Sequence, residues 1–132
     1  QHSVTVECDP GIELNNDPGA LAQVVTNLVM NSMIHGFEGV KHGAIKMKIV
    51  EEGDSLIFEY SDSGRGMDEE TRKKVFDPFF TTRRGTGGSG LGMNIVFNLV
   101  TQTLGGSISC ESAVGDGATF TMTFPRDIAQ AA

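Results

Sequence analysis

The sequence has no tryptophan, one tyrosine, two cysteines and no long apolar run. Cys8 and Cys110 fit no metal-ligand spacing and define no disulfide framework, so we expect both to be buried thiols in a reducing compartment. A bilayer span needs about 20 apolar residues, whereas the apolar runs here are only a few residues long. No charged-then-apolar leader opens the chain. We therefore expect a cytoplasmic domain that makes no membrane contact of its own.

Basic residues are also scarce. Ten Lys and Arg stand against 17 Asp and Glu, which gives a net charge of −7 and argues against a nucleic-acid-binding surface. Six of the ten basic residues lie between positions 65 and 84. Arg72, Lys73 and Lys74 are expected on the solvated face of a helix. Arg83 and Arg84 lie in a loop of glycine and threonine, where contact with phosphate is the stronger interpretation.

The 132 residues suit one domain, 1–132, with a core over about 4–125. Alternating and helical apolar patterns predict a two-layer α+β sandwich. One mixed, mainly antiparallel sheet would carry the helices on one face. The predicted strands are 4–8, 43–50, 55–60, 106–112 and 118–124, with a brief one at 12–14; the predicted helices are 18–37, 68–75 and 91–104.

The helix predicted over 18–37 begins with Asp17 as a cap and Pro18 at its first position. A polar row spaced by four runs beside its apolar stripe. Glutamine at the start of that row suits solvent, but asparagine is a poor mid-helix residue, so its amide oxygens are candidate ligands for Mg²⁺ and phosphate. The expected buried stripe is Leu21, Val24, Val25, Leu28 and Met33, and the polar row is Gln23, Asn27, Asn31 and His35.

Five glycines crowd into the eight residues 85–92, directly before the helix predicted over 91–104. Such a loop leaves backbone N–H groups free at a helix N-terminus, which favours phosphate binding. The dinucleotide fingerprint Gly85-x-Gly87-x-x-Gly90 is rejected because no buried strand precedes it. A P-loop is excluded because no Gly-Lys-Ser/Thr follows. The helix is expected to align Leu91, Ile95, Asn98 or Leu99, and Gln102 along one line.

Four short motifs occur in a fixed order. Asn27-Leu-Val-Met-Asn31, Asp62-Ser-Gly-Arg-Gly66, Phe76-Asp-Pro-Phe-Phe80 and Gly88-Ser-Gly-Leu-Gly92 resemble the N, G1, F and G2 boxes of the ATP-binding domain of sensor histidine kinases. The resemblance extends from about 4 to 125. It implies the Bergerat fold, which type II topoisomerases, heat-shock chaperones and mismatch-repair ATPases share.

The resemblance implies a role for each matching residue. At the base, Asp62 would accept a hydrogen bond from the adenine amine, and Thr119 would reach adenine. Gly64 and Gly66 would keep the pocket wall thin, and Met67 would pack on the ring. At the phosphates, the implied contacts are Asn27, Asn31, His35, Arg83, Gly88, Ser89, Gly90, Leu91 and Gly92.

Asn31 is implied as the Mg²⁺ ligand, and Asn31 and Arg83 as the catalytic residues; Arg83 replaces the usual lysine. Two positions depart from the family pattern: Ser32 stands where alanine is usual, and Ile34 where a basic residue is common. In the ATPase branches a glutamate activates water at the position of Asn27. An amide cannot act as that base, so we expect phosphoryl transfer with negligible hydrolysis.

The acceptor histidine is expected on a separate dimerisation domain of the same parent protein, with a response regulator downstream. None of His2, His35 and His42 stands on a long helical hairpin. The chain is therefore expected to be a monomeric catalytic fragment that binds ATP. Two alternatives stay open: a nucleotide-gated interaction module with a lid over 81–87, and a serine kinase of the anti-sigma type.

Overall fold

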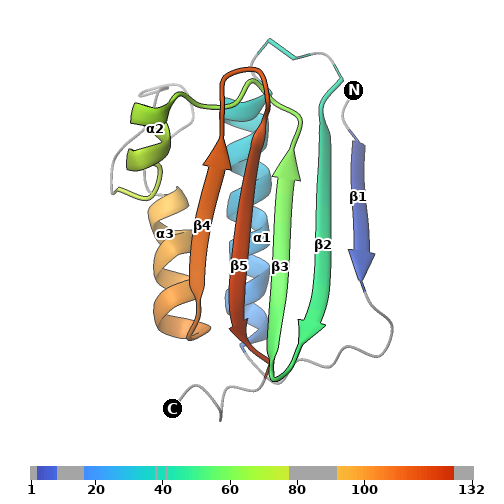
Figure 1. The fold of residues 1–132 in the computed structure, drawn as a ribbon, viewed down its shortest axis with the longest axis vertical. Coiled ribbons are helices and arrows are strands. Elements are labelled where there is room, and N and C mark those ends of the chain that lie inside the picture. Colours follow the sequence, from blue (N-terminus) through green and yellow to red (C-terminus); the bar gives the residue numbers. More distant parts are fainter. Residues whose placement is uncertain (1–2, 9–16, 38, 41, 78–91, 127–132) are drawn as a thin grey trace.

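A computed structural model describes residues 3–8, 17–37, 39–40, 42–77 and 92–126. It has two layers, a five-stranded sheet with helices covering one face (Figure 1). The elements are β1 (Ser3–Cys8), α1 (Pro18–Asn31), β2 (Ala44–Glu52), β3 (Ser55–Asp62), α2 (Glu69–Lys74), α3 (Gly92–Asn98), β4 (Ser107–Ser112) and β5 (Ala118–Pro125). The expected α+β sandwich is confirmed, while the brief strand at 12–14 lies outside the described residues. None of the helices described is long and apolar enough to cross a bilayer.

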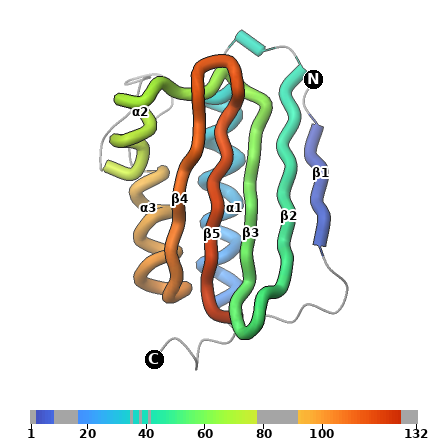
Figure 2. The backbone as a smooth tube through the Cα atoms, viewed as in Figure 1, coloured from blue at the N-terminus to red at the C-terminus, as the bar shows by residue number. Residues whose placement is uncertain are grey.

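The strand order is β1-β2-β3-β5-β4 (Figure 2). β1 pairs in parallel with β2, and every other pairing is antiparallel, so the sheet is mixed. Along β3 and β5 each second side chain is buried under the helices, which is the period-two pattern of a strand with one covered face. Asp62 is the last buried residue of β3, and it pairs with Ala118, the first buried residue of β5.

Helix α1 starts as predicted: the Asp17 carboxylate accepts the N–H of Ala20 at 3.0 Å, with a proline in the first turn. Its buried line is Ala20, Val24 and Leu28, and a π-helical segment, η1 (Ser32–Gly36), continues it with Ser32. The expectation that Met33 is buried is wrong, since this residue is 40% exposed. Residues spaced by four share one face of the helix, so position 32, and not position 33, is the next buried position after Leu28.

The helix after the glycine run is α3, extended by a second π-helical segment, η2 (Leu99–Thr103). The expected line through Ile95, Asn98 and Gln102 lies on the exposed side of this helix, with Ile95 exposed by 39%. Large apolar residues occur on both sides of this helix, so its pattern does not single out the inner face. The sheet is contacted instead by the line Met93, Val96, Val100 and Leu104.

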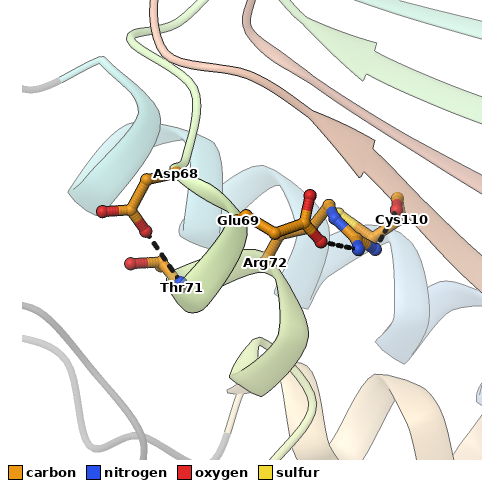
Figure 3. Close-up of polar contacts among 5 residues, drawn as sticks. All are labelled: Asp68, Glu69, Thr71, Arg72 and Cys110. Atoms are coloured by element: carbon orange, nitrogen blue, oxygen red, sulfur yellow. Dashed lines mark hydrogen bonds and ion pairs between the residues drawn. The ribbon is translucent and has the colours of Figure 1, made fainter.

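The short helix α2 is fixed at both ends (Figure 3). Asp68 caps it by accepting the N–H of Thr71 at 2.8 Å, and this bond lowers the pKa of the carboxyl. Arg72 pairs with Glu69 and donates to the Cys110 carbonyl of β4 at 3.3 Å. Lys73 and Lys74 are solvent-facing as expected, whereas Arg72 is half-buried and ties α2 to the sheet.

The two cysteines lie in different surroundings. Cys8 is exposed because every residue of the edge strand β1 is exposed, which corrects the expectation of two buried thiols. Cys110 is buried, and burial raises the pKa of its thiol to about 12 from 9.0. Burial likewise raises the pKa of the Tyr60 hydroxyl to about 12 from 10.0.

These shifts predict a loss of stability at alkaline pH. A proton held more tightly in the folded state stabilises it fully below the unfolded pKa, and this contribution is lost as pH rises towards the folded pKa. The free energy of unfolding should therefore fall from about pH 9, where the unfolded Cys110 thiol ionises first. Urea unfolding between pH 7 and 11 measures this. With Cys110→Ala the decline should begin about one pH unit later, from Tyr60 alone; an unchanged profile would show that Cys110 is not responsible.

Candidate functional site

Asp62 is a buried carboxylate at the end of β3, with 7% of its surface exposed. Its Oδ1 accepts the N–H of Gly64 at 3.0 Å, and its Oδ2 accepts the hydroxyl of Ser32 at 2.8 Å. Each oxygen is therefore held by one donor and keeps capacity for another. The carboxylate is a fixed acceptor at the junction of the sheet and the helix layer.

Three backbone segments approach one another around this carboxylate. The Gly36 carbonyl accepts the N–H of Arg65 at 2.8 Å, and a Cβ at Gly64 would lie 2.3 Å from that carbonyl oxygen. A Cβ at Gly36 would lie 3.1 Å from Asp62 Oδ2. Glycine at these positions therefore permits the contact of η1 with the chain after β3 and leaves space beside the carboxylate.

The other wall is the turn between β4 and β5. Gly66 has a φ of 72°, and a Cβ there would lie 2.0 Å from the Ala113 carbonyl oxygen. A Cβ added at Gly117, which has a φ of 69°, would likewise lie 2.0 Å from the carbonyl oxygen of Asp62. Met67 is half-buried against the core, and its N–H donates to Ser112 Oγ at 2.9 Å. Gly64 and Gly66 therefore lie where the backbone is too closely packed for a side chain, and their role in a pocket wall stays a prediction.

The predicted polar row of α1 divides into two parts. Gln23 is exposed as expected, whereas Asn27 and Asn31 are half-buried. The Nδ2 atom of Asn27 is buried and has no hydrogen-bond partner among the described residues. Rotation of the carboxamide by half a turn exchanges its oxygen and nitrogen, so Asn27 can place either a hydrogen-bond acceptor or a donor at this position. The side chain of His35 falls outside the described part of the chain.

These carboxamides fit a hard cation, which takes neutral amide oxygens as ligands. An orphaned buried amide is costly unless a ligand satisfies it. Across the described ranges, His, Cys, Asp and Glu form no cluster of three that could hold a metal. The amides of Asn27 and Asn31 are the candidate cation ligands on this side of α1.

Thr119 does not lie beside Asp62. The register of β3 and β5 pairs Asp62 with Ala118, and Thr119 with Ser61. Since side chains alternate along a strand, Thr119 faces the side of the sheet opposite to that of Asp62. The residue next to the carboxylate on the covered face is the buried Ala118.

The remaining predicted phosphate ligands are described only in part. Arg83, Gly88, Ser89, Gly90 and Leu91 lie outside the described residues, and Gly92 is the first residue of α3. In the last described stretch before them, Phe76 is held by ring contacts and a hydrogen bond. Its ring lies 5.4 Å from that of Phe97 and 6.2 Å from that of Phe120, and its carbonyl accepts Asn94 Nδ2 at 3.1 Å. Phe76 is thus packed against α3 and β5 near the end of the described stretch that follows α2.

Residues 16–128 match the family described as histidine kinase-, DNA gyrase B- and HSP90-like ATPases. The chain belongs to this family. It is 34% identical over 122 residues to the sensor kinase CckA of Brucella abortus, covering 83% of this chain and 13% of that protein. It is 38% identical over 125 residues to the sensor histidine kinase ZraS of Klebsiella oxytoca, covering 93% of this chain and 26% of the relative. The chain thus spans about a quarter or less of these relatives.

Solved structures agree with this assignment. The catalytic domain of the histidine kinase ThkA superposes with a TM-score of 0.80 at 28% identity, covering 96% of this chain and 81% of that chain. The mycobacterial sensor histidine kinase MprB has a TM-score of 0.77 at 23% identity, covering 96% and 83%, and supports the fold alone. The expected ATP-binding domain of the sensor histidine kinase type is confirmed.

Sequence reasoning missed how this histidine kinase domain supports its acidic residue. Ser32 and Tyr60 are fully buried, and their hydroxyl oxygens lie 2.7 Å apart. A signal was present, because Ser32 continues the fourfold line of Ala20, Val24 and Leu28 and so places a hydroxyl on a buried face. The only tyrosine of the chain lies two residues before Asp62, on the same face of β3.

Proposed function

We propose that this domain binds ATP with Asp62 as the acceptor for the adenine amine, and donates the γ-phosphoryl group to a histidine. The histidine belongs to a separate dimerisation domain of the parent protein, which acts in the cytoplasm and passes the phosphoryl group to a response regulator. The observation that carries the base assignment is the buried carboxylate with both oxygens held by donors. A fixed acceptor favours adenine over guanine, which presents a carbonyl at that position.

The phosphates would lie along the other end of the same face. Ser32 follows Asn31 in the chain and contacts Asp62, so the amide row of α1 begins beside the base site. Asn31 would hold Mg²⁺, which neutralises phosphate charge when bound, and Asn27 would face the phosphates. Arg83 and the backbone of 88–92 would complete the phosphate contacts, with His35 at the end of the row and Met67 against the base. Catalysis then consists of positioning and charge neutralisation, because Asn27 is no general base.

Asn31→Ala separates the two halves of this site. We expect at least a 10-fold loss of the Mg²⁺-dependent gain in ATP affinity and of phosphoryl transfer, because an amide oxygen ligand is removed. Adenosine binding without metal should change little. Titration of ATP and adenosine with and without Mg²⁺ measures both, and equal losses for the two ligands would contradict the assigned role. Gln23→Ala, on the exposed end of the same row, is the matched control.

The phosphoacceptor is tested by supplying it separately. The domain is incubated with γ-labelled ATP and the histidine-bearing helical hairpin of a sensor kinase, and the phosphoprotein is exposed to acid and to alkali. We expect acid-labile, alkali-stable label on the hairpin and none on the domain. Acid-stable label on a serine partner would instead identify an anti-sigma-type kinase. ATP binding without any transfer would favour a nucleotide-gated interaction module.

A further inference from the structure

The carboxylate of Asp62 is held by a chain of two buried hydroxyl groups. Ser32 Oγ lies 2.8 Å from Asp62 Oδ2 and 2.7 Å from Tyr60 Oη. Ser32 and Tyr60 are both fully buried, so water does not compete for these bonds. The chain links the helix layer to β3, between residues separated by about 30 positions in the sequence.

The direction of these hydrogen bonds follows from the number of protons. Ser32 has one hydroxyl proton, and the ionised carboxylate is the stronger acceptor, so Ser32 donates to Asp62. The 2.7 Å contact between the two hydroxyls needs a proton, and since that of Ser32 points to Asp62, Tyr60 supplies it; the Leu28 carbonyl, at 3.1 Å, is the longer of the two contacts of Tyr60 Oη. Burial raises the pKa of Tyr60 to about 12, so the donor keeps its proton at neutral pH. The order is Tyr60 to Ser32 to Asp62.

We propose that Ser32, supported by Tyr60, is a positioning residue that fixes Asp62 as an acceptor and thereby sets the preference of the site for 6-aminopurines over 6-oxopurines. This inference rests on the proposed contact of Asp62 with the base. With Oδ1 held by the N–H of Gly64 and Oδ2 by Ser32, the carboxylate cannot rotate. A rigid acceptor keeps its remaining lone pairs aimed at the ligand without an ordering cost on binding.

The proposal is tested by comparing the affinities of ATP and ITP, which differ at the 6-position of the purine. Competition against a fluorescent ATP analogue gives both dissociation constants for the wild type, Ser32→Ala, Tyr60→Phe and the double variant. We expect Ser32→Ala to lower the ATP-to-ITP preference about tenfold, the size of one charge-assisted hydrogen bond. Tyr60→Phe should lower it less, because it acts through Ser32, and the double variant should match Ser32→Ala alone.

The controls separate positioning from stability. Thr26→Ala removes a hydroxyl from the exposed face of the same helix, where it bonds the Ala22 carbonyl, and should leave both affinities unchanged. A merely structural role would lower Tm and weaken ATP and ITP equally. An unchanged ATP-to-ITP ratio in both Ser32→Ala and Tyr60→Phe overturns the inference. If Ser32→Ala fails to fold, Tyr60→Phe, which keeps the ring in the core, decides alone. Failure of the wild type to bind ATP would instead overturn the proposed function.

Discussion

Replacing Asp62 with asparagine is expected to weaken ATP binding by about 100-fold, because a charged acceptor aimed at the adenine amine becomes a neutral group with a donor. Both carboxylate oxygens now accept hydrogen bonds, from Gly64 N–H and from the Ser32 hydroxyl. Only one oxygen remains after the substitution, bound to the N–H of Gly64, and the position of the other acceptor becomes an N–H donor. The amide nitrogen then stands where an acceptor is required. Calorimetric titration with ATP measures the loss.

The fold should survive this substitution. Ser32 can turn its proton to Tyr60 Oη and accept from the introduced amide, while Tyr60 donates to the Leu28 carbonyl at 3.1 Å. Circular dichroism and Tm should therefore stay close to wild type. Glu59→Gln makes the same chemical change on the exposed face of the same strand and should leave ATP affinity unaltered. Retained ATP affinity in Asp62→Asn would exclude this carboxylate from base recognition.

Gly66→Ala should cause a large loss of stability. The added Cβ would lie 2.0 Å from the Ala113 carbonyl oxygen, on a backbone with a φ of 72°. The chain after β3 must then move away from the turn between β4 and β5. We expect a loss of several kcal/mol, roughly 3 or more, in the free energy of unfolding. ATP affinity should fall with it, because Met67 and the pocket wall shift.

Gly115→Ala is the matched control for this effect. Gly115 also has a positive φ, 88°, but no atom lies within 4 Å of its added Cβ. The free energy of unfolding of this variant should therefore fall only by the cost of placing alanine in the left-handed backbone region, about 1–2 kcal/mol. Its ATP affinity should be that of the wild type. Urea unfolding and ATP titration of both variants separate the effect of the close contact, present only at Gly66, from that of the positive φ, which both glycines have. Equal losses in the two variants would show that the contact between Gly66 and Ala113 does not shape the pocket.

Much of the fold follows from local patterns. Alternation in 55–60 and 118–124 predicted two strands of the sheet, and the first of them extends in the structure to Asp62. Alternation along a strand also fixes which side chains share a face, so the placement of Thr119 opposite to Asp62 depends on the register of β3 with β5. That register is a tertiary property that no local pattern gives. The exposure of Cys8 similarly depends on its strand being at the sheet edge.

Within the site, only the residues that belong to the motifs could be predicted from the sequence. Asp62 and its two glycines were identified from the resemblance of their motif, but the hydroxyl chain behind the carboxylate joins the helix layer to β3 across the sequence. Its residues carry no motif beyond a serine on a buried helical line. The inner face of α3 was missed because apolar residues such as Ile95 and Phe97 occur on its exposed side. Arg72 was placed in solvent because its acceptor, the Cys110 carbonyl, lies 38 residues away.

The most direct test of the account is a calorimetric titration of the wild-type domain with a non-hydrolysable ATP analogue and with the corresponding GTP analogue, each with and without Mg²⁺. The account predicts that the ATP analogue binds about tenfold more tightly with Mg²⁺, and that the GTP analogue binds at least about 100-fold more weakly than the ATP analogue. Equal affinities with and without the metal would contradict the role of the carboxamides. A preference for the GTP analogue would contradict the recognition of adenine by Asp62.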